Sequence, residues 1–504
     1  MKEIFEEVKN FMQNKIFIIC LILIAILSFG FGITHISVGI DDLCFDRYVT
    51  GTWMLSENRW GTWAIYNLFK IDSFTPFWLE FMTVLIYFVT ALVLCAIVKI
   101  VSKDKLSDVS YLLLGCGYIS FPILSFQFVY QSTNITVALS NLILIIISYL
   151  IFSNYNEKKN KLWLIPYVLL SAFAIACYES CLQTYAVMAL INVLLWVRCS
   201  EKEIKFKEIA ILGLVFIMLI TLAIGVYFGV AALVKVYLKS IGELHPNSAY
   251  SVTIFDRFKD VGKKVAIIEL YRDRYETMIE TNKADKFVFV ALFGSIVFII
   301  CAIVNAIKNK KYHIIWLAIL AWGVNLIFPI VFISLLYRIY YSWAVMIGFE
   351  FLFIYETINE IEILNKIKID KIVLVLMTFI ILLQSKETSN KLYADYRANE
   401  ETKNRFILIG NTIKSYCSES GKPVVYKYKG LTMTSTFDWS VNVFGDMGAV
   451  ITQYINYNGF YIQNSGVRWE ESLWMVPDDY ENRKIINSYV SEGTHYIYVE
   501  INQQ

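Results

Sequence analysis

Residues 16–35 read IFIICLILIAILSFGFGITH, an apolar run long enough to cross a bilayer, and this run decides the class of fold. The segment before it is short and charged. No small-x-small cleavage pattern follows the run, and the next residues are charged and aromatic. We therefore expect a retained first helix and not a cleaved signal peptide. Directly beyond its end the chain places two adjacent carboxylates, Asp41 and Asp42.

The rest of the chain continues this apolar character. Of its 504 residues 57% are hydrophobic and 17% charged, and the mean hydropathy is +0.54. A soluble domain could not cover so much apolar surface, so the pattern predicts a mainly α, polytopic transmembrane fold of about eleven helices. The expected helices are 16–35, 76–101, 109–126, 134–153, 162–178, 181–197, 209–238, 286–306, 314–334, 340–358 and 371–385. The connections near Gln131 and Ser180 are very short, so the helices that flank each of them are alternatively re-entrant.

The distribution of basic residues predicts the orientation. If the N-terminus is inside, eighteen Lys and Arg residues fall in six short inner segments, whereas the short outer loops hold only Arg47, Arg59, Lys70 and Arg338. Lys and Arg near a membrane resist translocation, so we expect a cytoplasmic N-terminus in a bacterial inner membrane. The net charge of +2 gives no signal for a nucleic-acid partner.

This orientation puts three long segments outside. They are the first loop, residues 36–75, a second loop, residues 239–285, and the tail from residue 386. The tail mixes a predicted helix at 399–415 with predicted strands at 423–428 and 494–501. We expect a transmembrane domain, residues 1–385, followed by a small extracytoplasmic α/β domain, residues 386–504.

The first outer loop holds the strongest candidate residues. Asp41 and Asp42 lie where the first helix leaves the membrane, within reach of a lipid-borne substrate. Crowding by a second carboxylate raises the pKa of an acid, which suits a general base working on a sugar hydroxyl near neutral pH. The sequence leaves open which Asp is the base. A carboxylate pair also suits Mg²⁺ or Mn²⁺, so a metal requirement stays open as well.

Cations and aromatic residues surround this pair. Arg47 and Arg59 are candidates for clamping a phosphate, because a guanidinium binds phosphate bidentately. Trp53 and Trp60 suit either anchoring at the interface or stacking on a sugar ring.

Other outer turns add further candidates. Arg338 is the only basic residue of its turn and is a phosphate-ligand candidate, with snorkelling to lipid head groups as the alternative. Glu179 lies in a tight turn between two apolar helices, where an ionisable group suggests function. Tyr130 is a further candidate for substrate binding.

Several chemistries are disfavoured. The motifs GxGxxG, GxxxxGK[ST], HExxH and GxSxG are absent, which argues against nucleotide hydrolysis, zinc proteolysis and serine esterase activity. The nine Cys and four His residues show no metal-ligand spacing, so we expect the cysteines to be small core residues.

Together these features resemble a known family. The order is a short inner N-terminus, one helix, an outer loop with Asp41-Asp42 and Arg59-Trp60, further helices and an outer tail. It is similar to the glucosyltransferase II-type (Gtr) membrane glycosyltransferases, which belong to the wider GT-C group. Relatives often carry Gly-Arg-Trp, whereas here Asn58 precedes Arg59. The turn around Glu179 resembles a Tyr-Gln-Ser-like turn of relatives.

The resemblance implies a chemistry. The donor is expected to be a sugar, with glucose favoured, on undecaprenyl phosphate, and the acceptor a cell-surface glycan such as O-antigen or another surface polysaccharide. Asp41 or Asp42 would deprotonate the acceptor, and Arg59 and Arg338 would stabilise the leaving lipid phosphate.

Two other classes remain as alternatives. A transporter or flippase of lipid-linked glycans would share the helices and the basic residues, but it predicts inverted repeats and ionisable residues near the midplane. A polysaccharide polymerase or ligase would depend on outer-loop Arg or His and not on an early acidic pair.

Overall fold

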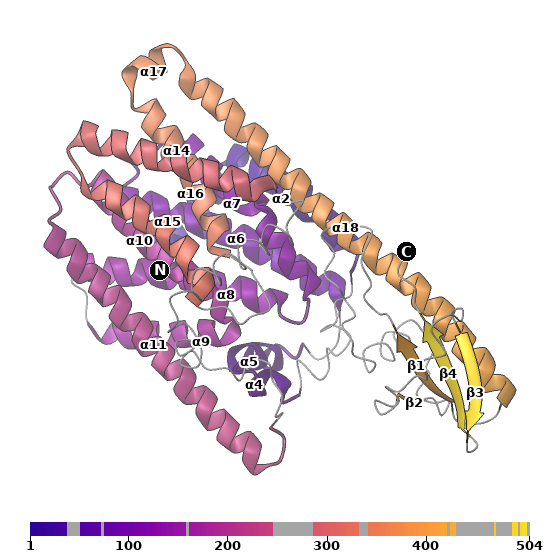
Figure 1. The fold of residues 1–504 in the computed structure, drawn as a ribbon. Helices are drawn as coiled ribbons and strands as arrows, with labels where there is room; N and C mark the ends of the chain where they lie inside the picture. Colours follow the sequence, from indigo (N-terminus) through magenta and orange to yellow (C-terminus); the bar gives the residue numbers. More distant parts are fainter. Residues whose placement is uncertain are drawn as a thin grey trace, which may run out of the picture.

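A computed structural model describes residues 1–37, 51–71, 75–157, 161–244, 286–331, 341–420, 424–429, 468–469, 486–491 and 494–500. Most of these residues are helical, and the helices form one bundle (Figure 1). The helices are α1 (Lys2–Gln13), α2 (Lys15–Thr34), α4 (Trp53–Ser56), α5 (Trp60–Leu68), α6 (Pro76–Ser102), α7 (Asp108–Ser120), η2 (Pro122–Val129), α8 (Asn134–Asn156), η3 (Lys161–Trp163), α9 (Leu164–Cys177), η4 (Glu179–Cys181), α10 (Leu182–Cys199), α11 (Phe206–Ser240), α14 (Lys286–Asn309), α15 (His313–Val331), α16 (Tyr341–Asn359), α17 (Glu362–Lys366) and α18 (Ile369–Ser420).

The chain is a multi-pass membrane protein. Each apolar stretch expected to be helical contains a helix, and within the described ranges seven helices are long and apolar enough to cross a membrane. Two more, Leu164–Cys177 and His313–Asn325, are apolar but shorter. Seven is fewer than the expected number. Helix α16 is not among the seven. It carries Glu350 and Glu356, and nearly all its side chains are buried inside the bundle.

Helix α16 packs against α7 at very close range. A Cβ atom at Gly348 would lie 2.5 Å from the carbonyl oxygen of Leu114, and one at Gly117 would lie 2.8 Å from the Phe351 ring. Glycine at both positions therefore lets the two backbones meet, as small residues do between membrane helices. On the outside of the bundle, α2 and α11 expose rows of Ile, Leu and Phe side chains, which suits contact with lipid.

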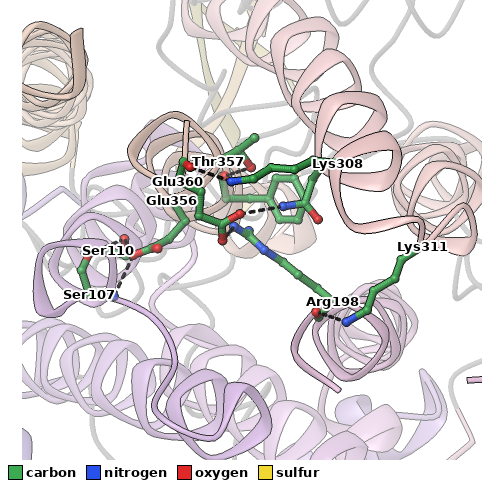
Figure 2. Close-up of polar contacts among 10 residues, drawn as sticks. Ser107, Ser110, Arg198, Lys308, Lys311, Glu356, Thr357 and Glu360 are labelled. Carbon is green, nitrogen blue, oxygen red and sulfur yellow. Dashed lines mark hydrogen bonds and ion pairs between the residues drawn. The ribbon is translucent and has the colours of Figure 1, made fainter. Parts of the chain in front are cut away.

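Polar contacts among Arg198, Lys308, Lys311, Glu356 and Glu360 join the ends of several helices, and we call this region the basic end (Figure 2). There Glu356 of α16 accepts three hydrogen bonds through Oε1. Two come from the backbone N–H and the hydroxyl of Ser107, at 2.7 and 2.6 Å, and one from the hydroxyl of Ser110, at 2.5 Å. The first turn of a helix has unpaired N–H groups and the positive end of the helix dipole, so a carboxylate stabilises it. Glu356 thus caps α7 from another helix.

At the basic end, lysine residues cap the C-terminal ends of helices. Lys311 Nζ donates to the carbonyl oxygens of Arg198 and Ser200, both at 2.6 Å, where α10 leaves its last carbonyls unpaired. Burial lowers the pKa of the Lys311 ammonium. Lys308 Nζ donates to the carbonyl oxygen of Glu360 at 2.6 Å, and the Glu360 carboxylate pairs with Arg198 at 2.8 Å. Caps contributed by α16 and by the end of α14 therefore join the ends of α7, α10 and α16.

The C-terminal part begins with one long helix. The predicted helix at 399–415 is continuous with the last apolar stretch, because α18 runs from Ile369 to Ser420, and the expected domain boundary at residue 386 falls inside it. Beside the end of α18 lie β1 (Val424–Lys429), β2 (Arg468–Trp469), β3 (Ile486–Ser491) and β4 (Thr494–Glu500) (Figure 1). Their order is β2-β1-β4-β3, with β1 parallel to β2 and β4, and β3 and β4 antiparallel. Most of the tail beyond residue 420 lies outside the described residues, so an α/β domain remains a prediction.

Candidate functional site

Arg59 is positioned by a tight turn that ends helix α4. The N–H of Asn58 donates to the carbonyl oxygen of Leu55 at 3.2 Å, and the N–H of Arg59 donates to that of Met54 at 2.8 Å. This pair of bonds is a Schellman motif, which needs a residue in the left-handed region. Asn58 has φ +66°, a conformation that glycine adopts freely and that asparagine tolerates better than most residues. Asn58 therefore makes a left-handed turn that glycine would make as readily.

Helix α5 then packs directly on α9. A Cβ atom at Gly61 would lie 2.6 Å from the carbonyl oxygen of Phe173, so only glycine allows this approach. The next residue, Thr62, donates its hydroxyl proton to the carbonyl oxygen of Cys177 at 2.9 Å, at the end of α9. Both contacts hold the start of α5 against the turn that contains Glu179.

This packing places Arg59 beside an aromatic ring and a carboxylate. Its Cζ lies 5.5 Å from the centroid of the Tyr178 ring, and its Nη1 lies 3.6 Å from Oε2 of Glu57. Glu57 also accepts a hydrogen bond at 2.7 Å from the indole N–H of Trp53. The Arg59 side chain is 17% exposed, so a mostly buried guanidinium remains partly open to solvent. A planar guanidinium in such a setting suits recognition of phosphate.

Glu179 and Trp60 lie around the same turn. The hydroxyl of Tyr227 on α11 donates to Oε1 of Glu179, while Glu179 as a whole remains exposed. Trp60 packs edge-on against Phe173, with ring centroids 5.9 Å apart. Its buried indole N–H has no hydrogen-bond partner among the residues that the structure describes. A buried donor of this kind suits a hydroxyl group of a bound sugar.

Tyr130 is connected to Arg59 through a chain of contacts. Tyr178, which Arg59 faces, lies edge-on to Tyr341 with centroids 6.4 Å apart. The Tyr341 hydroxyl donates to Oε1 of Gln127, and Nε2 of Gln127 donates to the carbonyl oxygen of Tyr130 at 3.2 Å. Tyr130 and this turn are buried inside the bundle. We call the region of these contacts the site end.

Four sequence candidates lie outside the described residues. They are Asp41, Asp42, Arg47 and Arg338. Their roles therefore stay predictions. The described residues nearest to Arg338 in sequence begin at Tyr341, which belongs to the site end.

Sequence reasoning missed several residues of the site end. Tyr178 and Glu57 adjoin candidate residues in the sequence, and their contacts with Arg59 could have been suspected from that closeness. Tyr227 offers no such signal, because it lies within the 35-residue apolar helix α11 and reaches Glu179 across 48 positions of sequence.

The described residues contain no group of three or more His, Cys, Asp or Glu side chains placed to hold a metal ion. Asp41 and Asp42 are not among them. A divalent metal at the acidic pair therefore remains an open question.

Comparison with known families shows the family to which the chain belongs. The family model described as glucosyl transferase GtrII matches residues 30–355, well over half of the chain, from the end of α2 through most of α16. The chain belongs to the glucosyl transferase GtrII family. It is therefore a glycosyltransferase of the membrane, and the matched range includes the whole site end. No curated protein and no solved structure gave a match.

Proposed function

We propose that this GtrII-family protein transfers a sugar, glucose in the first instance, from undecaprenyl phosphate to a cell-surface glycan. The supporting observation is the mostly buried Arg59, which is held between Glu57 and the Tyr178 ring. The chain also belongs to a family of sugar transferases. A fixed guanidinium in the same outer loop of the sequence as Asp41 and Asp42 suits a donor whose leaving group is a phosphate.

The proposed reaction is a direct displacement. An oxygen of the acceptor hydroxyl forms a bond to the anomeric carbon while Asp41 or Asp42 takes its proton. The bond between the anomeric carbon and the phosphate oxygen breaks, and its electron pair leaves with undecaprenyl phosphate. Arg59, with Arg338, stabilises the negative charge that develops on this phosphate. Release of the product and loss of the proton from the Asp to solvent return the enzyme to its starting state.

The remaining residues have proposed roles in binding. Trp60 offers the sugar its indole N–H, which has no partner among the described residues, and Trp53 offers its ring. Glu179 and Tyr130 line the acceptor side. Arg47 assists in binding the phosphate. These roles extend the contacts at the site end and rest on the same proposal.

The proposal includes an orientation and a division of the chain. The site end faces the outside of a bacterial inner membrane, the N-terminus is cytoplasmic, and residues 1–385 form a GT-C-like catalytic domain. The loop 239–285 and an extracytoplasmic domain, residues 386–504, shape the acceptor groove. The excess of Lys and Arg in the six sequence segments expected to be inside supports this orientation.

Mass spectrometry of the surface glycan tests this function. Cells that produce the wild-type protein should carry one more hexose on the glycan than cells lacking the gene. Asp41→Asn with Asp42→Asn should abolish this hexose, and Arg59→Ala should reduce it strongly, at unchanged protein level. As a control, Lys207→Ala removes an exposed cation near the start of α11 and should leave the hexose in place.

Two outcomes would overturn the proposal. One is a full hexose complement in the Asp41→Asn/Asp42→Asn double variant. The other is no difference between glycans with and without the gene, accompanied by altered movement of the intact lipid-linked sugar, which is the behaviour of a flippase.

A further inference from the structure

The Glu179 carboxylate is held by a tyrosine that comes from another helix. The hydroxyl of Tyr227, on α11, donates to Oε1 of Glu179, the first residue of the short turn η4. Tyr227 is only 2% exposed, whereas Glu179 is exposed. The bond therefore joins the packed interior of the bundle to a carboxylate that solvent reaches.

The Tyr227 ring is fixed by packing between α9 and α11, which lie side by side (Figure 1). It belongs to an apolar cluster with Ala172 and Ala176 of α9, and Trp60 packs against the same cluster. The Phe228 ring lies next to it, with centroids 4.8 Å apart. A ring packed in this way has few alternative rotamers, so its hydroxyl keeps one position.

The turn that carries Glu179 is also fixed through its backbone. The N–H of Cys181 donates to the carbonyl oxygen of Tyr178 at 3.2 Å, which closes the turn. The Thr62 hydroxyl donates to the carbonyl oxygen of Cys177 at 2.9 Å and ties the turn to α5. Contacts from α5 and α11 therefore determine where the carboxylate lies.

Only one of the two Glu179 oxygens is engaged. Oε1 accepts the Tyr227 bond, and Oε2 has no hydrogen-bond partner in the part of the chain that the structure describes. A carboxylate accepts hydrogen bonds at both oxygens, so Oε2 is able to accept one from a hydroxyl group of a ligand. Its negative charge disfavours a phosphate at the same place.

Exposure and charge favour the acceptor over the donor as this ligand. The Arg59 side chain, which faces Tyr178, is 17% exposed and positive, which suits the phosphate of a donor held in the membrane. Glu179 is exposed and negative, which suits the hydroxyl groups of a glycan that arrives from the aqueous side.

We propose that Tyr227 is a positioning residue that holds Glu179 so that its Oε2 accepts a hydrogen bond from a hydroxyl group of the acceptor glycan. Glu179 touches the acceptor, and Tyr227 acts through Glu179. This inference rests on the proposed function and deepens it, because it assigns the outward-facing carboxylate to one of the two substrates. It also gives a role to a residue in the middle of an apolar helix.

A bond that only stabilised the fold would have a different effect. A buried tyrosine hydroxyl usually has a hydrogen-bond partner, and losing the bond then costs stability alone. In that case Tyr227→Phe lowers the thermal midpoint and leaves the KM for both substrates unchanged. A positioning role predicts a change in the KM for the acceptor.

Steady-state kinetics on membrane vesicles separate these cases. The donor is undecaprenyl-phosphate glucose, and the acceptor is the surface polysaccharide purified from cells that lack the gene. Tyr227→Phe keeps the ring and removes the hydroxyl. It should raise the acceptor KM by on the order of 10-fold, while kcat and the donor KM change less than about threefold. Glu179→Ala removes the ligand itself and should raise the acceptor KM by on the order of 100-fold.

Tyr185→Phe is the matched control. Tyr185 is likewise 2% exposed, and its hydroxyl donates at 3.1 Å to the carbonyl oxygen of Phe216, which also belongs to α11. This variant should keep the wild-type acceptor KM. Tyr227→Phe should have no further effect on the acceptor KM in a Glu179→Ala protein, because nothing remains to be positioned. Gel filtration and thermal unfolding in detergent check that each variant is folded.

The proposal is overturned if folded Tyr227→Phe keeps the wild-type acceptor KM, if Tyr185→Phe raises it as much, or if the donor KM rises instead. Failure of the proposed function looks different, because then wild-type vesicles would transfer no hexose to the polysaccharide.

Discussion

At the scale of single residues, the clearest case is Asn58, whose left-handed backbone sets the direction in which Arg59 leaves α4. A residue branched at Cβ pays about 1–2 kcal/mol in this region. We predict that Asn58→Val lowers thermal stability accordingly and reduces sugar transfer, because it displaces Arg59 from the Tyr178 ring. Asn58→Gly should retain both properties, as measured by unfolding in detergent and by transfer assay. Equal stability of Asn58→Val and Asn58→Gly would contradict the role of the turn.

Asp395 provides a prediction about pH. It lies on α18 beyond the expected span at 371–385, and burial raises the pKa of its carboxyl from 3.8 to about 6, although the Ser37 hydroxyl lowers it somewhat. The folded state thus binds this proton more tightly than the unfolded state. The protonated Asp395 stabilises the folded protein fully below pH 3.8. This contribution, on the order of 3 kcal/mol, is lost as the pH rises through 6.

We therefore predict that the unfolding midpoint of the wild type, minus that of Asp395→Asn, becomes more negative between pH 4 and pH 7. Taking the difference removes the contribution of other titrating groups. Thermal unfolding in detergent at a series of pH values measures it, and a difference that does not change with pH would contradict the raised pKa.

At the scale of elements, helix ends at the basic end are capped by side chains of other helices (Figure 2). Removing the Glu356 carboxylate leaves the Ser107 N–H, the part-buried Ser107 hydroxyl and the buried Ser110 hydroxyl without this acceptor. Such a loss costs about 1–3 kcal/mol. We predict that Glu356→Ala lowers the thermal midpoint by several degrees. Glu362→Ala is the control. Glu362 makes an exposed ion pair with Lys366 at 3.9 Å, so its loss should change the midpoint little.

At the scale of the whole molecule, the basic end and the site end are separated along α10 and α16, each of which starts at one end and finishes at the other. The proposed orientation predicts that a cysteine at Lys239, near the site end, reacts with a membrane-impermeant maleimide in right-side-out vesicles. A cysteine at Lys310, near the basic end, should react only after the membrane is opened. Cys44 and Cys417 would be replaced by Ser to reduce background. The reverse pattern of labelling would contradict the orientation.

Sequence alone predicted most of the helices, because a membrane span must satisfy its own backbone and bury an apolar surface in lipid, and both requirements are local. It also identified Arg59, Trp53, Trp60 and Glu179 as candidates, since ionisable and aromatic residues stand out beside apolar helices. The GtrII family match agrees with the resemblance seen in those residues.

Only the tertiary structure decided which residues meet. Tyr227 reaches Glu179 from the middle of an apolar helix, and Gln131 reaches the carbonyl oxygen of Ser37 from the turn before α8. Neither contact has a local signal, because the position of a partner across the bundle depends on how helices pack and not on periodicity. The sequence identified the acidic pair beyond α2. The hydrogen bond from Gln131 to the carbonyl oxygen of Ser37, three residues beyond that helix, became visible only in the fold.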